Sequence, residues 1–191
     1  MTAALDAAKW WCDWRVRKYD EDATAWLTSR LGRIPQGRHF VDAGIEPFED
    51  NDILGNLLTT AGVARIHGLV TAVGGLQAAS ATAARIGVGD GTGTAVIGDT
   101  DLGAAAGSSH RQFVIMDSSF PTAGTTMTFQ ATFTSALGNY AWNEFGIDIG
   151  TPTVANGTTV AALLLNHKTS IAQGTKTSGQ SWVASATITI A

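Results

Sequence analysis

The stretch ARIGVGDGTGTAVIGDTDL, residues 84–102, combines glycine and aspartate in the way that phosphate-binding and metal-binding turns do. A P-loop requires G-x-x-x-x-G-K-[ST], and the stretch contains no lysine. A dinucleotide-binding turn requires Gly or Ala three residues beyond a G-x-G pair, inside a βαβ unit. This chain has Thr92, Thr94 or Val96 at that point and no βαβ pattern around it. Neither kind of phosphate site is predicted.

The three aspartates of this stretch raise the question of calcium. Asp90, Asp99 and Asp101 supply hard oxygen ligands, but they do not follow the EF-hand order and no neighbouring glutamate adds a bidentate ligand. Glycine and aspartate also favour tight turns for backbone reasons alone. The sequence favours a turn, with a calcium ion near these aspartates as the alternative.

Catalytic patterns are weak in the rest of the chain. The histidines are scattered and lack the H-E-x-x-H spacing, so we interpret them as surface or interface groups: His39, His67, His110 and His167. A hydrolytic set of Ser108, Ser109, His110 and Asp117 lacks the G-x-S-x-G elbow. We expect no catalytic residue, no cofactor and no bound metal, and a hydrolase is only the second rival interpretation.

Glu144 is the acid most expected to be buried, because it lies between Trp142 and Phe145 in a strand-like segment. A buried carboxylate needs a partner. We predict a structural ion pair of Glu144 with Arg111, with Arg85 or Lys168 as the other candidates.

Composition narrows the class of protein. The chain has 191 residues, a net charge of -4 and one cysteine, Cys12. Such a charge gives no general basic surface for nucleic acid. A single cysteine excludes an intrachain disulfide and a cysteine-rich zinc site, and it suits a reducing compartment. We expect no export signal and no membrane span.

The charges also divide the chain unevenly. Residues 1–52 hold 7 of the 12 Lys and Arg and 10 of the 16 Asp and Glu. We therefore predict a helical and extended N-terminal arm over residues 1–50, a linking helix over 51–75 and an antiparallel β domain over 76–191. Ala7, Trp10, Trp11 and Trp14 recur at spacings of three and four, which predicts an aromatic stripe on a helix.

Two more helices are predicted in the first part. The first begins after Asp20 or Asp22 and ends at Gly32, since aspartate caps N-termini and glycine suits the C-terminal exit. The second begins after Asn51 or Asp52. Residues 33–50 lack periodicity and contain two prolines, so we interpret them as an extended arm.

Alternation dominates the second part. In TTMTFQATFT, Met127, Phe129, Ala131 and Phe133 share one face. Similar short strands, separated by Gly, Pro, Asn or Ser clusters, are predicted over 111–116, 139–147, 160–165 and 182–190. The chain is therefore predicted to be mainly β, an antiparallel β-sandwich or small barrel with an N-terminal helical arm.

Several of these segments, taken in order, resemble virion proteins of tailed bacteriophages, in particular the β-rich attachment modules of phage tail and collar fibres. The matching features are the VGDG turn at 88–91, the T-x-L segment at 100–102, Arg111, the F-x-A-x-F strand at 129–133 and W-x-E-x-G-I at 142–147. The resemblance covers residues 54–191. Fibre proteins usually continue into long shafts, whereas this sequence stops at Ala191 after its last predicted strand.

The resemblance implies a non-enzymatic virion subunit, built in the host cytoplasm, that docks on capsid, neck or tail as a capsid decoration or tail or collar adaptor. Its partners would be other virion proteins and copies of itself, with a trimer by analogy to fibre modules, and neither nucleic acid nor membrane. We assign the partner interface to six aromatic residues: Trp10, Trp11, Trp14, Trp26, Phe40 and Phe48. A chain without residues 1–50 is then expected to fold but not to enter particles.

The alternative is a carbohydrate-binding or host-receptor recognition module of a tail fibre. In such a module, exposed aromatic rings such as Trp142 or Trp182 would stack on sugars. Both tryptophans fall on alternating strand positions, which favours the core instead.

Overall fold

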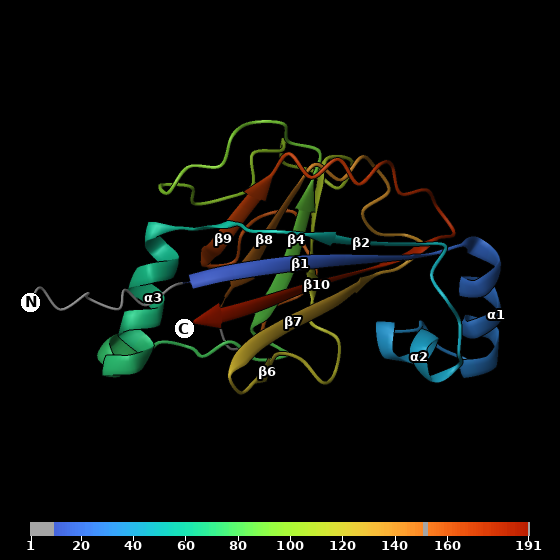
Figure 1. Cartoon of the computed structure of the whole chain (residues 1–191), viewed down its shortest axis with the longest axis horizontal. Helices are drawn as coiled ribbons and strands as arrows, with labels where there is room; N and C mark the ends of the chain where they lie inside the picture. Colours follow the sequence, from blue (N-terminus) through green and yellow to red (C-terminus); the bar gives the residue numbers. More distant parts are fainter. Residues whose placement is uncertain (1–9, 151–152, 191) are drawn as a thin grey trace, which may run out of the picture.

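Two open antiparallel sheets of five strands form a β-sandwich (Figure 1). The structure, a computed structural model, describes residues 10–150 and 153–190. Sheet A holds, in spatial order, β2 (Glu49–Ile53), β1 (Trp10–Tyr19), β10 (Ser181–Ile190), β7 (Thr126–Phe133) and β6 (Thr122–Ala123). Sheet B holds β3 (Leu57–Leu58), β9 (Leu163–Thr169), β8 (Glu144–Ile149), β4 (Ala84–Gly89) and β5 (Arg111–Ile115). The predicted fold class, a mainly β antiparallel sandwich, is confirmed.

The core lies between the two sheets and is rich in aromatic rings. Trp14 of β1 stacks on Phe145 of β8, with ring centroids 4.8 Å apart, so one contact joins the sheets. Trp142 meets Phe133 and Trp182 edge to face at 4.7 and 4.8 Å. These are favourable geometries for aromatic pairs. Phe133 lies on the inward face predicted for its strand.

Residues 10–19 form a strand, so the predicted helix is wrong at Trp10, Trp11 and Trp14. Ala7, the fourth residue of the predicted stripe, lies outside the described residues. β1 pairs with β10 along its whole length, from Trp10 opposite Ile190 to Tyr19 opposite Ser181. The segment WCDWRVRKY also alternates, since Cys12, Trp14 and Val16 are buried while Trp11 and Arg15 are exposed. The sequence fits both a helical period and an alternating period. Pairing with β10 and burial of one face select the strand.

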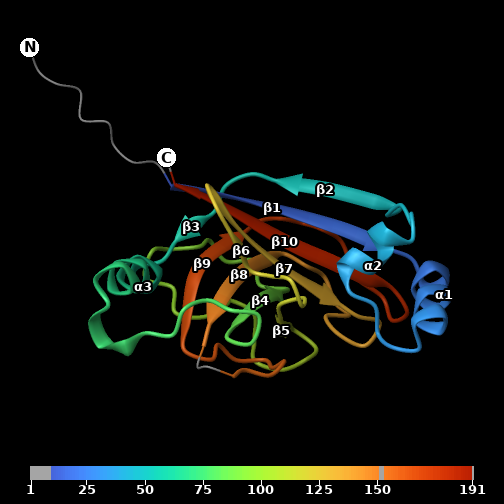
Figure 2. The same cartoon turned by 90° about the horizontal axis from the view of Figure 1, so that it is seen from below.

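Two helices cover one end of the outer face of sheet A (Figure 2). α1 (Glu21–Leu31) begins after Asp20, whose carboxylate accepts the Ala23 N–H at 2.8 Å, and it ends at Gly32 in the left-handed conformation. Both helix ends are as predicted. α2 (Gly37–Asp42) lies where the sequence predicted an extended arm, and its Phe40 stacks on Tyr19 at 3.9 Å. This packing holds the helical pair rigidly on the sheet.

The third helix lies at the other end of the molecule, against β9 (Figure 1). α3 (Thr60–Thr71) is capped by Thr59, whose hydroxyl accepts the Gly62 N–H at 2.9 Å, and not by Asn51 or Asp52. Those two residues lie in β2. Gly62 permits close packing, since a Cβ there would lie 2.1 Å from the Leu165 carbonyl oxygen. A short 3-10 turn, η1 (Val73–Gly75), follows.

The N-terminal part is built into the sandwich. β1 lies between β2 and β10, and it contributes Trp14 and Val16 to the central core. Removing residues 1–50 would delete β1 and the first two residues of β2, and it would uncover the edge of β10. The structure therefore argues against the expectation that a chain without residues 1–50 folds.

Candidate functional site

Three of the sequence motifs meet at the Glu144 carboxylate: the VGDG turn, the T-x-L segment and the E-x-G-I strand. Glu144 begins β8 and is fully buried. Its Oε1 accepts the Ala104 N–H at 2.7 Å, and its Oε2 accepts the Gly103 N–H at 2.8 Å. The loop after VGDG is thereby fixed on sheet B by a strand from a distant part of the chain. We call Glu144, His167, Asp99, Gly103 and Ala104 the Glu144 cluster.

His167 of β9 completes the cluster. β8 and β9 are neighbours in sheet B, and the Nε2 atom of His167 lies 2.8 Å from Oε2 of Glu144. Its Nδ1 atom lies 2.6 Å from Oδ2 of Asp99, in the loop between β4 and β5. The imidazole thus bridges two carboxylates, one fully buried and one at the surface of the loop.

This geometry requires a charged imidazole, because a neutral ring can donate only one hydrogen bond. Burial opposes the charge on His167, but hydrogen bonds to Glu144 and Asp99 outweigh it and raise the pKa of His167. Burial likewise favours a neutral Glu144, but the donors His167, Gly103 and Ala104 outweigh it and lower the pKa of Glu144. The cluster is therefore an ion pair extended to a second carboxylate.

Two glycines of the VGDG turn lie directly against the carboxylate. A Cβ at Gly89 or Gly91 would come within 2.4 or 2.5 Å of Oε1 of Glu144. Neither glycine has a left-handed backbone conformation, so close approach and not φ explains the residue type. The VGDG turn and the E-x-G-I strand therefore belong to one physical unit.

Arg111 does not pair with Glu144, contrary to the prediction. Its nearest carboxylate is Asp101 at 3.1 Å, and its Nη1 donates to the carbonyl oxygens of Leu102 and Ala104 at 3.2 and 3.3 Å. Glu144 binds the N–H groups of the same loop segment. The two residues thus hold the same loop through different backbone groups, and the counter-ion of Glu144 is His167.

The three aspartates of the loop do not form one calcium site. Asp90 lies 2.8 Å from His110, Asp99 lies 2.6 Å from His167, and Asp101 lies 3.1 Å from Arg111. Within residues 10–150 and 153–190, no three His, Cys, Asp or Glu side chains are placed to hold a metal ion. Each aspartate instead contacts a separate histidine or arginine side chain.

The Glu144 cluster is arranged for structure. Both ring nitrogens of His167 and both oxygens of Glu144 already have partners, and none of these partners is a hydroxyl or thiol nucleophile. The imagined hydrolytic set is separated, since Asp117 accepts from Gly37, Gln130 and Thr132 while His110 faces Asp90. The Glu144 cluster therefore offers a braced loop and no nucleophile–base pair.

The six aromatic residues assigned to a partner interface fall into two groups. Trp14 and Phe40 are buried within the chain itself, and Trp10 is half-buried against the core. Trp11, Trp26 and Phe48 remain available, with exposed fractions of 39, 48 and 52%. Trp142 and Trp182 are buried, so neither can stack on a sugar as the alternative interpretation required.

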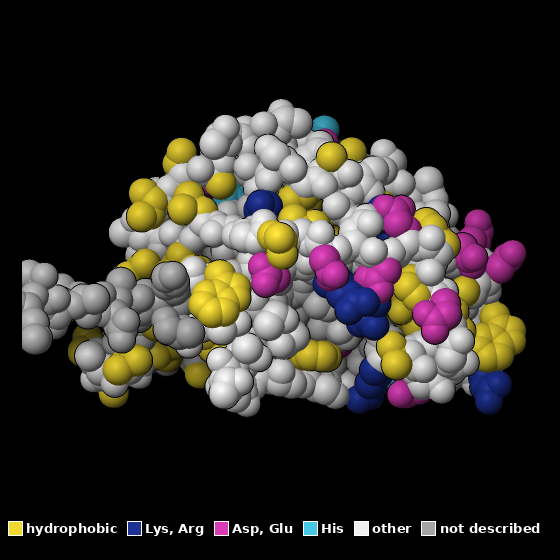
Figure 3. Space-filling model, viewed as in Figure 1, with side chains coloured by type: hydrophobic (Ala, Val, Ile, Leu, Met, Phe, Trp, Pro, Cys, Tyr) yellow, Lys and Arg dark blue, Asp and Glu magenta, His cyan; other side chains and the backbone are white. Residues whose placement is uncertain are grey.

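Exposed apolar side chains lie at both ends of the long axis, and Figure 3 shows others on the face between the ends. The α3 end carries Leu69, Val70, Val73 and Leu76. The α1–α2 end carries Trp26, Ile34 and Val41. Between residues 60 and 84 the sequence has a single charged side chain, Arg65, and it is buried. An uncharged apolar surface of this kind commonly marks a protein contact.

Sequence reasoning missed the role of His167 and the buried pair of Arg85 with Asp148. The sequence held one indication of the role of His167. In LLLNHK, polar residues follow an apolar run within one strand, and Glu144 is a polar residue at the start of another strand. Nothing in the sequence showed that β8 and β9 are neighbours. Their pairing alone brings the two residues together.

No helix in the described residues is both long and apolar enough to cross a membrane. Comparison of the chain with protein-family models, with curated proteins and with solved structures finds no match. Its function must therefore be argued from the features above.

Proposed function

We propose that this chain is a non-enzymatic structural protein of a tailed-bacteriophage virion, an accessory subunit that docks on capsid, neck or tail. One observation carries the proposal: apolar side chains are exposed at both ends of a rigid sandwich. Two separate contact surfaces suit a subunit that lies between neighbours. Under this proposal its partners are other virion proteins and further copies of the chain.

The Glu144 cluster supports the same conclusion. The motifs that carry the resemblance to phage attachment modules include VGDG, T-x-L, Arg111 and E-x-G-I. Residues of all four lie within the cluster or directly against it. These residues hold the 21-residue connection between β4 and β5, residues 90–110, and this use suits a scaffold better than an enzyme.

The mode of docking differs from the one expected from sequence. Trp11, Trp26 and Phe48 project from a folded domain and not from a loose arm. Because these side chains are already positioned, docking loses less conformational entropy than ordering an arm would. Burying an exposed tryptophan contributes on the order of 2 kcal/mol by its apolar area.

Copy number in purified particles tests the proposal. Quantitative mass spectrometry should find the chain at hundreds of copies if it decorates a capsid or tail tube, or at a small multiple of three or six at the neck or tail tip. Two variants examine the contact surfaces, Val70→Asp at the α3 end and Trp26→Ser at the α1–α2 end. Ser29→Asp is the matched control, because Ser29 is exposed on α1 and polar.

At least one of the two surface variants should lower incorporation tenfold or more, while Ser29→Asp incorporates normally. The proposal fails if both variants incorporate like the wild type, if the chain never accompanies particles, or if the purified protein turns over a peptidoglycan or ester substrate.

A further inference from the structure

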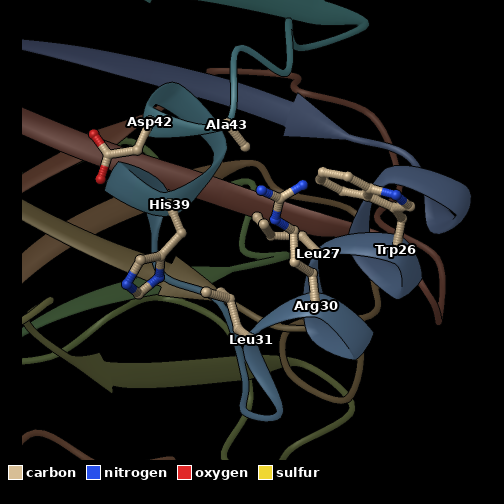
Figure 4. A pocket seen from close by; sticks show the side chains of 7 residues that line it. All are labelled: Trp26, Leu27, Arg30, Leu31, His39, Asp42 and Ala43. Carbon is tan, nitrogen blue, oxygen red and sulfur yellow. The ribbon is translucent and has the colours of Figure 1, made fainter.

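A concave pocket lies between α1 and α2 (Figure 4). Its volume is about 330 Å³, and it is lined by Trp26, Leu27, Arg30, Leu31, His39, Asp42 and Ala43. The floor is firm, because Leu27 packs in one buried cluster with Tyr19 and Phe40. The pocket is therefore formed before any ligand arrives.

The wall of the pocket at His39 has more hydrogen-bond donors than acceptors. The Gln36 N–H points at Nδ1 of His39 at 2.8 Å, and Nη2 of Arg33 lies 2.9 Å from Nε2. Arg38 approaches the same Nε2 atom at 3.4 Å. A neutral imidazole accepts at one nitrogen only, so at least one of these donors has no acceptor on His39 in either tautomer. Protonation would make the excess of donors larger.

His39 is held neutral by its surroundings. Burial, followed by the positive charges of Arg33 and Arg38, lowers the pKa of His39. Within the described residues, Arg30, Arg33 and Arg38 form no ion pair with any carboxylate. Arg33 and Arg38 are exposed and lie against His39, next to the residues that line the pocket, where their guanidinium groups can donate to an anionic group.

The opposite wall is aromatic. Trp26 is 48% exposed, and the guanidinium of Arg30 lies 5.2 Å from the centroid of its ring. Figure 4 shows Arg30 between Trp26 and Leu27, whereas the Asp42 carboxylate points away from Arg30. Asp42, the single acid of the lining, therefore lies on the side of His39 and does not compensate the charge of Arg30.

We propose that this pocket binds an acidic peptide segment of a neighbouring protein. Its carboxylates would lie at Arg30, beside Trp26, and at Arg33 and Arg38, beside His39, and an apolar side chain would lie against Trp26. Charge complementarity selects the carboxylate, and guanidinium groups bind carboxylates more strongly than neutral acceptors. Trp26, Leu27 and Leu31 accommodate the apolar part.

The lining favours a peptide over a sugar. Sugar hydroxyls need closely paired donors and acceptors, but no lining side chain is an amide or a hydroxyl, and Asp42 is the single carboxylate. Cationic and apolar side chains next to one another match alternating acidic and apolar residues. The inference names the class of partner that the α1–α2 end would bind. It rests on the proposed virion function only for which protein supplies the peptide segment.

Binding in solution tests the pocket separately from particle assembly. The probe is a hexapeptide of alternating glutamate and leucine, acetylated and amidated at its ends, and its glutamine counterpart is the neutral control. Titration is followed by calorimetry and by the indole N–H signal of Trp26 in ¹H–¹⁵N NMR spectra. We expect the acidic peptide to shift that signal and the glutamine peptide to bind at least tenfold more weakly.

Variants then locate the site. Trp26→Ala, Arg30→Gln and the double variant Arg33→Gln/Arg38→Gln should each weaken binding at least fivefold. Arg15→Gln is the matched control, since Arg15 is exposed on sheet A and pairs with Asp50, and it should bind like the wild type. If the double variant does not fold, the variants at the exposed residues Arg30 and Trp26 decide whether the peptide binds in this pocket.

Several results overturn the proposal: no binding of the acidic peptide, equal binding of the glutamine peptide, or unchanged affinity in the Arg30 and Trp26 variants. Tighter binding of glucuronate or inorganic phosphate than of the peptide overturns the peptide assignment. Peptide binding by a chain that does not enter particles would instead disprove the virion role, and the proposed binding function of the pocket would still be supported.

Discussion

Replacing His167 with alanine should destabilise the fold strongly, and the size of the effect should depend on pH. The imidazolium bridges Glu144, which is fully buried, and Asp99, whose side chain is 21% exposed. Removing one member of a buried ion pair costs about 3–5 kcal/mol, because the remaining charge is left without its partner. Two backbone N–H donors remain on Glu144, so we expect the lower end of this range, about 3 kcal/mol.

The sign of the pH dependence follows from the raised pKa of His167. Above the ordinary histidine value of 6.5, the folded protein holds a proton that the unfolded chain has lost. Stability is then fully present below pH 6.5 and falls as pH rises through the folded pKa. The lowered pKa of Glu144 acts in the acidic range, where its contribution is lost as pH falls below its ordinary value of 4.5.

Two other groups limit the window of the measurement. Because burial lowers the pKa of His39, its contribution is lost as pH falls below 6.5. Burial also lowers the pKa of Lys176 to about 8, so its slope has the opposite sign between about pH 8 and 10.5. The interval from pH 6.5 to 8 therefore isolates His167 from both groups.

The assay is urea unfolding followed by tryptophan fluorescence at pH 6.5, 7, 7.5 and 8. His167→Ala should cost about 3 kcal/mol at pH 6.5, and the difference from the wild type should shrink toward pH 8. His110→Ala is the matched control, because its pair with Asp90 is largely exposed and should contribute less than about 1 kcal/mol. A cost no larger than that of the control, or one that grows with pH, would refute the bridging role.

Three further predictions follow from packing. Gly91→Ala should destabilise the protein by about 1–3 kcal/mol in urea unfolding, because its Cβ would lie 2.5 Å from a buried carboxylate oxygen; Gly93→Ala has open space and should be neutral. Trp14→Ala should cost about 3–5 kcal/mol of unfolding free energy, whereas the exposed Trp26→Ala should cost under about 1 kcal/mol; similar melting temperatures for the two variants would contradict the placement of Trp14 in the core. Burial raises the pKa of the Cys12 thiol to about 12, so iodoacetamide should label it in urea but not in the folded protein, and labelling of the folded protein at neutral pH would show that it is accessible.

The local features of the sequence determined a large part of the fold. The alternation in β7 predicted which side chains face the core, and Asp20 and Gly32 predicted both ends of α1. These signals were sufficient because each depends on residues within one turn or one strand. The antiparallel sandwich followed from the number and spacing of such strands.

The contacts between distant segments were decided by the tertiary structure alone. The tryptophans at 10–14 satisfy both a helical and an alternating period, and pairing with β10 selected the strand. Glu144 could be recognised as buried, but its partner depended on which strand lies next to β8, and that neighbour brought His167 and not Arg111. Strand order is set by burial and hydrogen bonding over the whole chain, so local patterns do not contain it.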